Sequence, residues 1–147
     1  MGVSLLIGWL ICIVTCFSPD TFTFRKSKSS HADMNRVGNE AKETGTKLMV
    51  FPEGTRNSSK GLNLLPFKKG AFHVALDGKL PILPVVISEY DFLDQTKWIF
   101  NSGEITIRAL PRIDTSMYSK ENINELVEHS RNIMQEELRA MAKIKSE

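Results

Sequence analysis

Short apolar runs alternate along the chain with polar, glycine-containing connections. Residues 47–51 and 81–88 are apolar runs of strand length, and the second is apolar almost throughout, which is typical of a strand buried on both faces. Residues 104–110 alternate isoleucine and alanine with polar side chains, which predicts a half-buried strand. The pattern therefore predicts three strands separated by longer polar stretches.

Apolar residues recur at helical spacing in three other stretches. They predict helices over 33–44, over 70–76 and from about residue 119 to 143, with Ser119 as the N-cap of the last helix and Glu121 in its first turn. The apolar stripe of the last helix is interpreted as core packing. Helices that alternate with buried strands predict an α/β fold with a largely parallel or mixed sheet flanked by helices.

The beginning of the chain is unusually apolar, and its first charged side chain is Asp20. A membrane-spanning helix needs about 17 to 25 apolar residues, so segment 1–17 reaches the lower limit. The basic residues of 25–28 that follow would put the rest of the chain in the cytosol. We therefore expect 1–17 to be either a membrane-associated segment or a buried core element, followed by one domain over 18–147.

Composition and charge narrow the classes of protein. With 147 residues, 41% hydrophobic and 24% charged, the chain resembles an average globular domain and not a disordered or low-complexity protein. A balance of 19 basic and 17 acidic residues leaves a net charge of +2, which is too even to indicate nucleic-acid binding. Two cysteines four residues apart fit neither a disulfide framework nor a zinc site.

The segment Phe-Pro-Glu-Gly-Thr-Arg at 51–56 directly follows a predicted strand, where open α/β sheets bind ligands. Gly54 lets the backbone approach a ligand closely, and Thr55 adds a hydroxyl group. Arg56 offers a rigid fork of donors that matches two phosphate oxygens. Glu53 is placed to orient that fork or to accept a hydrogen bond from a polyol hydroxyl.

Two cations, Lys68 and Lys69, stand just before the predicted helix over 70–76. The N-terminus of a helix favours anions through its free amide groups and its dipole, and Lys69 is the cation that we add to the candidate site. These features together indicate a site for a phosphorylated small molecule. The alternative is a local ion pair between Glu53 and Arg56 in a surface turn.

Three blocks follow one another in close succession, namely Phe-Pro-Glu-Gly-Thr-Arg at 51–56, Leu-Pro-Phe-Lys-Lys-Gly-Ala-Phe at 65–72 and Leu-Pro-Ile-Leu-Pro-Val-Val at 80–86. This order resembles the glycerolipid acyltransferase family, specifically the 1-acylglycerol-3-phosphate (lysophosphatidate) acyltransferases, from about residue 25 to the last helix. The resemblance implies that the first block binds the acceptor phosphate, through Glu53, Gly54, Thr55 and Arg56. It also implies that the third block contributes to the acyl pocket, through Pro81, Ile82, Pro84 and Val85.

The resemblance further implies a reaction. In this family an acyl group passes from acyl-CoA to the sn-2 hydroxyl of lysophosphatidic acid, which gives phosphatidic acid and CoA. The expected partners are therefore lysophosphatidic acid, acyl-CoA as co-substrate and the endoplasmic reticulum membrane, with the site facing the cytosol or the membrane surface and with no metal or other cofactor. The alternative from a different class is a non-catalytic membrane module that binds lysophosphatidate or phosphatidate.

The catalytic element of that family, a histidine followed five residues later by an aspartate, is not found in this sequence. The residues five positions after the three histidines are Arg36, Gly78 and Met134. We therefore assign no catalytic residue, and we expect the acyltransferase-like domain to be incomplete at its N-terminus and the chain by itself to be inactive. An earlier family block ends in an arginine that contacts the acceptor, and its nearest match is Arg25, preceded by Phe24 in place of the usual acidic or amide residue.

Overall fold

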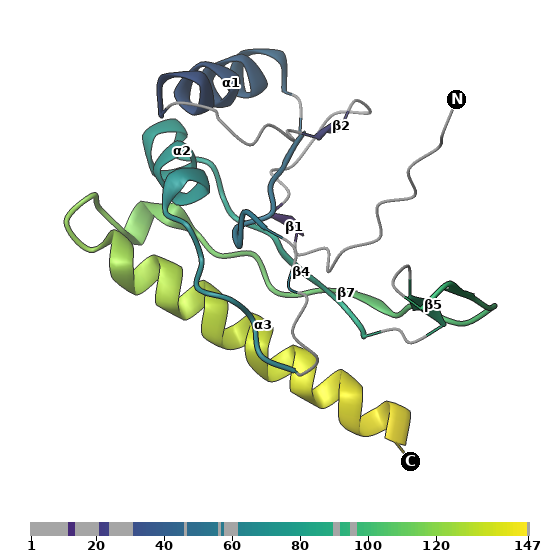
Figure 1. Cartoon of the computed structure of the whole chain (residues 1–147). Coiled ribbons are helices and arrows are strands. Elements are labelled where there is room, and N and C mark those ends of the chain that lie inside the picture. The colour runs from purple at the N-terminus through teal and green to yellow at the C-terminus, as the bar shows by residue number, and fades with distance from the viewer. Residues whose placement is uncertain are drawn as a thin grey trace, which may run out of the picture.

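A computed structural model of the chain describes residues 12–13, 21–23, 31–45, 47–55, 57, 62–89, 92–94 and 97–146. Within these residues, three α-helices flank a set of short strands (Figure 1). In chain order the elements are β1 (Cys12–Ile13), β2 (Thr21–Thr23), α1 (His31–Thr44), β3 (Lys47–Met49), α2 (Gly70–Gly78), β4 (Pro84–Ile87), β5 (Leu93–Asp94), β6 (Ile99–Phe100), β7 (Ile107–Ala109), the short 3₁₀ helix η1 (Thr115–Met117) and α3 (Ile123–Ser146).

Strand β4 is the centre of a three-stranded sheet with the order β1-β4-β7, and both of its pairings are antiparallel. Val85 of β4 lies opposite Cys12 on one side and Ala109 on the other. Strands β2 and β3 form a parallel pair, and β5 and β6 an antiparallel one. The predicted α/β class is therefore confirmed, and strand pairs of both directions occur, as in the mixed-sheet alternative.

Helix α3 supplies much of the core and runs along one side of β4 and β7 (Figure 1). The predicted apolar stripe of this helix is confirmed, because its members face the interior and three of them are almost fully buried: Leu126, Met134 and Leu138. Phe72 of α2 and Ile82 lie in the same cluster, each with 0% of its surface exposed. Burying one such side chain stabilises the fold by about 1.5–3 kcal/mol, so this cluster holds α2, α3 and the sheet together.

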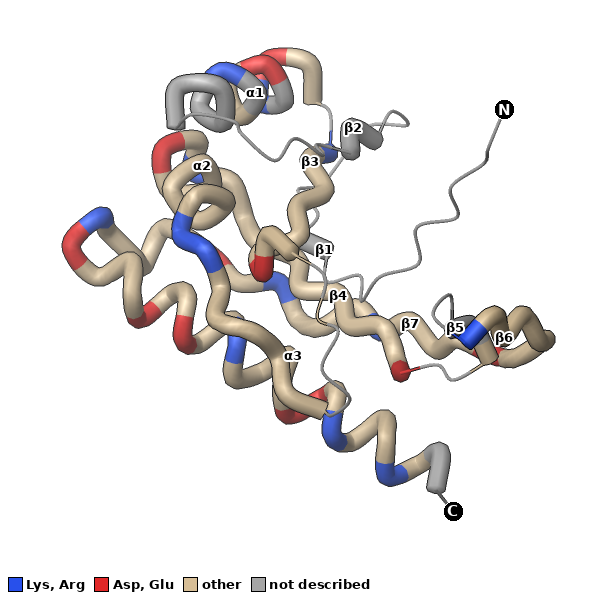
Figure 2. The backbone as a smooth tube through the Cα atoms, in the orientation of Figure 1, with Lys and Arg blue, Asp and Glu red and all other residues tan. Residues whose placement is uncertain are grey.

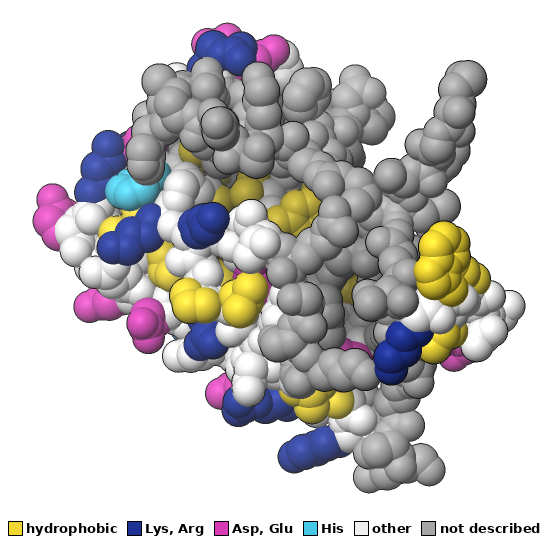
Figure 3. Space-filling model, in the orientation of Figure 1, with side chains coloured by type: hydrophobic (Ala, Val, Ile, Leu, Met, Phe, Trp, Pro, Cys, Tyr) yellow, Lys and Arg dark blue, Asp and Glu magenta, His cyan; other side chains and the backbone are white. Residues whose placement is uncertain are grey.

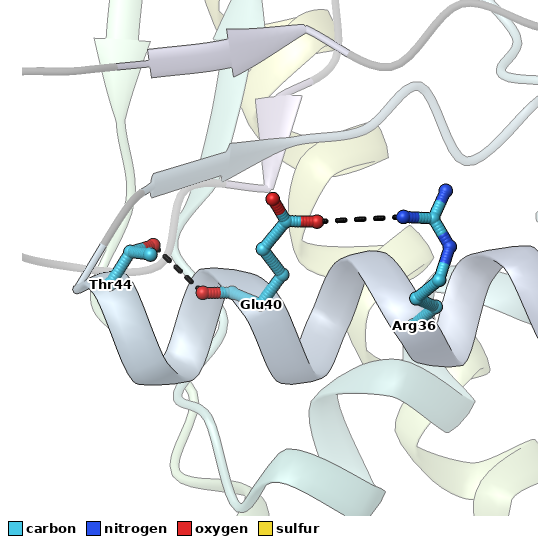
Figure 4. Close-up of polar contacts among 3 residues, drawn as sticks. All are labelled: Arg36, Glu40 and Thr44. Atoms are coloured by element: carbon cyan, nitrogen blue, oxygen red, sulfur yellow. Dashed lines mark hydrogen bonds and ion pairs between the residues drawn. The ribbon is translucent and has the colours of Figure 1, made fainter.

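Helix α1 begins two residues before the predicted start and ends where Gly45 takes a positive φ of 70°. On its exposed face, Arg36 pairs with Glu40 at 3.7 Å, and the hydroxyl of Thr44 donates to the Glu40 carbonyl at 2.7 Å (Figure 4). An exposed pair of this kind adds at most about 0.5 kcal/mol. The tertiary position of α1 therefore depends on its packing against α2, with which it lies side by side (Figure 1).

The start of α3 and the end of α2 also differ from the sequence prediction. Helix α3 begins at Ile123, and Ser119 is not its N-cap, because the Ser119 N–H instead donates to Asn122 Oδ1 at 2.5 Å in a turn that precedes the helix. Helix α2 continues through Gly78, two residues beyond the predicted end. It ends at Lys79, which has a positive φ of 51° and whose N–H donates to the Leu76 carbonyl at 3.1 Å.

The predicted strand over 104–110 is confirmed in part, but its predicted length and half-burial are wrong. Only Ile107–Ala109 forms a strand, β7, and all three of its residues are exposed, with 61% of the Ile107 surface accessible. The reason is its place at the edge of the three-stranded sheet, because α3 packs mainly on β4. A link to α3 is the ion pair between Arg108 and Glu137 at 2.6 Å.

Most of the apolar segment 1–17 lies outside the described residues. Its residues Cys12–Ile13 form β1 and pair with β4. Among the residues that the structure describes, no helix combines the length and the apolar character that crossing a membrane would require. The two interpretations of segment 1–17 stay predictions.

Candidate functional site

The chain leaves β3 in a tight turn. The Gly54 N–H donates to the Phe51 carbonyl at 3.1 Å, which closes the turn around Pro52. Gly54 has a φ of +65°, in the left-handed region that residues with a Cβ rarely adopt, so the glycine is required by the backbone itself. Gly54 and Thr55 are both exposed, and the turn therefore presents this part of the predicted phosphate-binding block to solvent.

Lys68 lies across this turn. Its backbone N–H donates to the Pro52 carbonyl at 2.7 Å, and a Cβ built on Gly54 would come within 2.7 Å of Lys68 Nζ. The side chain is exposed, so its ammonium group stands beside the turn at the surface. The second block thus contributes Lys68 to the site, in addition to the predicted Lys69.

Helix α2 begins directly after these lysines, and Lys69 occupies its N-cap position. No side chain caps this end within the described structure, and the first amide bonded back to the N-cap is that of His73, at 2.9 Å from the Lys69 carbonyl. The amides of the first helical turn have no partner inside the helix and carry its positive dipole end. Figure 2 shows basic residues where the chain enters α2. The turn, the lysines and the helix end together form an electropositive surface.

Glu53 belongs to the interior of the protein. Only 5% of its surface is exposed, and its Oε2 accepts a hydrogen bond from the Leu65 N–H at 3.0 Å. Burial raises the pKa of Glu53 above its ordinary value of 4.5, against the Leu65 hydrogen bond and the Arg131 guanidinium, which act in the opposite direction. These contacts make Glu53 an internal anchor under the turn, and its predicted roles of orienting Arg56 or accepting a hydrogen bond from a ligand hydroxyl stay predictions.

Segment 62–65 precedes the lysines, and in the described structure side chains of α3 bind its backbone. The Leu64 N–H donates to Gln135 Oε1 at 2.8 Å, and Gln135 Nε2 donates to the Leu62 carbonyl. Arg131 Nη2 donates to the Leu64 carbonyl at 2.6 Å. These α3 side chains satisfy backbone hydrogen-bonding groups of the segment, as a neighbouring strand would. The sequence does not predict these contacts, because a polar residue at every fourth position is also typical of a solvent-exposed helix face.

The third block, predicted to line an acyl pocket, lies partly in the core. Ile82 is fully buried and exchanges two backbone hydrogen bonds with Ile113, at 3.0 and 2.8 Å, and Pro84 is also among the fully buried residues. Pro81 and Val85 are half-buried. The acyl-pocket assignment stays a prediction, and Pro81 and Val85 are the two members whose side chains reach the surface.

Two arginines of the predicted site, Arg25 and Arg56, lie outside the described residues. The site that the structure describes therefore consists of the exposed residues Gly54, Thr55, Lys68 and Lys69 above the buried Glu53. Such a surface has the donors and the positive charge to bind a phosphate group, and it holds no described general base.

Comparison with known proteins identifies the family. The family model described as Acyltransferase matches residues 2–88. The chain is 38% identical over 136 residues to the 1-acyl-sn-glycerol-3-phosphate acyltransferase of Saccharomyces cerevisiae, which covers 90% of this chain and 43% of that protein. It is 38% identical over 114 residues to the enzyme of the same name from Escherichia coli, covering 78% of this chain and 45% of that protein.

A solved structure is also similar. The crystal structure of the 1-acyl-sn-glycerophosphate (LPA) acyltransferase PlsC from Thermotoga maritima matches with a TM-score of 0.57 and 28% identity, over 73% of this chain and 44% of that one. The chain therefore spans less than half the length of these relatives. The family match covers more than half of the chain itself, in the region that contains β3, the turn, α2 and β4. The chain belongs to the acyltransferase family.

Proposed function

We propose that this chain binds the phosphate of 1-acylglycerol-3-phosphate, the acceptor in a reaction that moves an acyl group from acyl-CoA to the sn-2 hydroxyl and gives phosphatidic acid. The observation that carries the proposal is the position of Lys68 across the exposed Gly54, next to the N-terminus of α2. The names of the relatives in yeast and Escherichia coli support the same acceptor and reaction.

The proposed contacts to the phosphate follow from the chemistry of each group. A phosphate carries negative charge on several oxygens, so it gains most from donors that are themselves charged. Lys68 supplies a compact ammonium group, α2 supplies its dipole, and Thr55 supplies a hydroxyl group. Arg56, the next residue after Thr55, would add a bidentate fork on the same phosphate.

Acyl transfer also needs a proton acceptor. The reaction forms an ester bond to the sn-2 oxygen, breaks the thioester bond of acyl-CoA and moves the hydroxyl proton to the departing thiolate. The sequence contains no histidine followed five residues later by an aspartate, so we propose that the chain by itself binds the acceptor without transferring the acyl group. We propose no metal or other cofactor for this reaction.

Binding measurements with the purified chain test the proposal. The chain is titrated with 1-acylglycerol-3-phosphate below its critical micelle concentration, and with the uncharged monoacylglycerol of the same acyl chain. We expect the phosphorylated lipid to bind at least about tenfold more tightly, and Lys68→Ala to remove most of that preference, since one charge-assisted contact contributes about 1.5–3 kcal/mol.

Lys42→Ala is the matched control, because Lys42 is an exposed lysine in the last turn of α1. It should bind both lipids as the unsubstituted chain does. Equal affinity for the two lipids, or an unchanged preference in Lys68→Ala, would show that the phosphate site is elsewhere. Turnover of acyl-CoA by the chain alone would contradict the proposed lack of activity.

We also propose that the chain works at a membrane surface, at the cytosolic side of the endoplasmic reticulum. Trp98 and Phe100, in and beside the short β5–β6 pair, are 82% and 62% exposed, and their rings meet edge to face at 6.3 Å. Figure 3 shows hydrophobic side chains gathered over this part of the molecule. Aromatic residues of this kind favour the boundary between water and lipid. The same observation favours the second candidate function, a non-catalytic membrane module that binds lysophosphatidate or phosphatidate.

A further inference from the structure

One face of α3 reaches back to a segment far earlier in the chain. Arg131, Gln135 and Arg139 follow one another at spacings of four residues, and all three bind segment 62–65, which precedes them by 66 to 76 positions. Arg131 and Gln135 bind its backbone, whereas Arg139 binds only the Asn63 side chain, at 3.1 Å on the surface. The α3 residues thus fix the segment that runs from the turn to Lys68.

Arg131 and Glu53 hold the same residue of that segment. Arg131 donates through Nε to the Leu65 carbonyl at 3.3 Å, while Glu53 accepts from the Leu65 N–H at 3.0 Å. The Arg131 guanidinium also lies close enough to the Glu53 carboxylate to oppose part of the rise in the Glu53 pKa that burial causes. The Leu65 N–H is therefore bound by the Glu53 carboxylate from the turn, and the Leu65 carbonyl by the Arg131 guanidinium from α3.

The distance along the chain from Leu65 to Lys68 is only three residues, and one of them is Pro66, whose φ is fixed. At the end of this short connection, the Lys68 N–H bonds to the Pro52 carbonyl at 2.7 Å, back on the turn. Few freely rotating backbone torsions separate Leu65 from Lys68, so they cannot compensate for a displacement of Leu65. Such a displacement would therefore move Lys68 relative to Gly54.

We propose that Arg131 is a positioning residue of the phosphate site, which holds Lys68 over Gly54 through Leu65 and Glu53 without touching the ligand. The inference rests on the proposed function, since it assigns Lys68 to phosphate binding. It connects α3, at the far end of the chain, with the turn that follows β3. A merely structural Arg131 would change the stability of the fold and leave the affinity of the folded protein as it is.

The test combines affinity with a double-mutant cycle. Arg131→Met removes the guanidinium and keeps an unbranched side chain, and Arg139→Met is the matched control on the same helix face. Affinity for 1-acylglycerol-3-phosphate is measured well below the unfolding temperature of each variant. We expect Arg131→Met to bind about tenfold more weakly and Arg139→Met to stay within about twofold of the unsubstituted chain.

The decisive comparison is made in the Lys68→Ala background. If Arg131 acts through Lys68, adding Arg131→Met to Lys68→Ala causes no further loss of affinity, because the group that it positions is already gone. The proposal would be overturned if the fold-losses of affinity of the two single variants multiplied in the double variant. Unchanged affinity in the folded Arg131→Met variant would also overturn it. If Arg131→Met fails to fold, Arg131→Lys keeps the charge beside Glu53 without the fork, and it should show a smaller loss that also vanishes in the Lys68→Ala background.

The failure of this inference differs from a failure of the proposed function. If Lys68→Ala binds the phosphorylated lipid normally, the phosphate site itself is wrong. If Lys68→Ala weakens binding and Arg131→Met does not, only the positioning role is wrong.

Discussion

The side chain of Lys68 occupies the space that a Cβ on Gly54 would need. Its Nζ, Cδ and Cε would lie 2.7, 2.8 and 2.8 Å from such an atom, which is closer than real side chains approach. Gly54 therefore does two things at once. It takes the positive φ that closes the turn, and it leaves room for an ammonium group directly over the backbone.

Gly54→Ala should weaken phosphate binding in a chain that still folds. The new methyl group strains a backbone with a φ of +65° by about 1–2 kcal/mol and displaces the Lys68 side chain, whose exposed end can move away. We expect affinity for 1-acylglycerol-3-phosphate to fall about tenfold, as for the loss of one charged contact, in a chain that still unfolds cooperatively.

Gly70→Ala is the control for the loss of a glycine. A Cβ at Gly70 has nothing within 4 Å, and the residue is the first of α2, so alanine should stabilise the fold by up to about 1 kcal/mol. Thermal unfolding and lipid titration of the two variants give the comparison. Normal binding by Gly54→Ala would mean that Lys68 does not serve the ligand from this position.

The negative charge of Glu53 should lower the stability of the fold, whereas its hydrogen bond with the Leu65 N–H should raise it. Because burial raises its folded pKa above 4.5, the folded state favours the protonated acid, and stability falls as the pH rises from about 4.5 through that raised pKa. Glu53→Gln keeps an acceptor for Leu65 and has no charge. It should therefore be at least as stable as the unsubstituted chain at neutral pH, with the two curves converging as the pH is lowered towards 4.5.

Glu53→Ala separates the hydrogen bond from the charge. Compared with Glu53→Gln, it leaves the Leu65 N–H without its acceptor, which should cost about 1–3 kcal/mol at every pH. Urea unfolding of the three chains between about pH 4.5 and 8 measures both effects. A Glu53→Gln variant that is much less stable at neutral pH would mean that attraction to Arg131 outweighs the cost of burial.

The sequence predicts those structural features that are determined within one segment, and it does not predict those that depend on packing between distant segments. The sequence predicts a strand over 81–88 that is buried on both faces. The observed strand β4 is shorter, Pro84–Ile87, and Val85 within it is half-buried, whereas Ile82 and Val86 are 0% and 1% exposed, because a nearly continuous apolar run has few other stable places in an α/β fold. The alternation at 104–110 has the right period for a strand, yet no pattern within a segment says whether another layer covers it. Ile107 therefore remains exposed at the sheet edge.

The same distinction applies to the site. Gly54, Lys68 and Lys69 lie within 15 residues of one another, so their blocks could be connected from the sequence. The contact between Leu65 and Arg131 joins residues 66 positions apart, and it exists only because α3 packs along the core beside this segment. The sequence predicts that Glu53 orients Arg56 or accepts a hydrogen bond from a ligand hydroxyl, and the described structure adds its buried contact with the Leu65 N–H.

Removal of the exposed aromatic pair should reduce binding to membranes. We expect the Trp98→Ser, Phe100→Ser variant to bind vesicles of phosphatidylcholine with anionic lipid at least about tenfold more weakly, since each buried aromatic side chain contributes about 1.5–3 kcal/mol. Met117→Ser is the matched control, because Met117 is 84% exposed and lies in η1, outside the β5–β6 region. Vesicle sedimentation measures both, and equal binding by all variants would place the membrane contact elsewhere.

The contact between α1 and α2 is tight enough to be tested by a double-mutant cycle. A Cβ on Gly38 would lie 2.3 Å from Val74 Cγ1, so Gly38→Ala should cost about 1–3 kcal/mol through overpacking, despite the better helix propensity of alanine. Val74 is 4% exposed, and Val74→Ala alone should also destabilise the fold. The double variant should be less destabilised than the sum of the two by at least about 1 kcal/mol, because the alanine at 74 makes the room that the alanine at 38 needs. Urea unfolding gives the three free energies, and additivity within about 0.5 kcal/mol would show that these two helices do not meet at Gly38 and Val74.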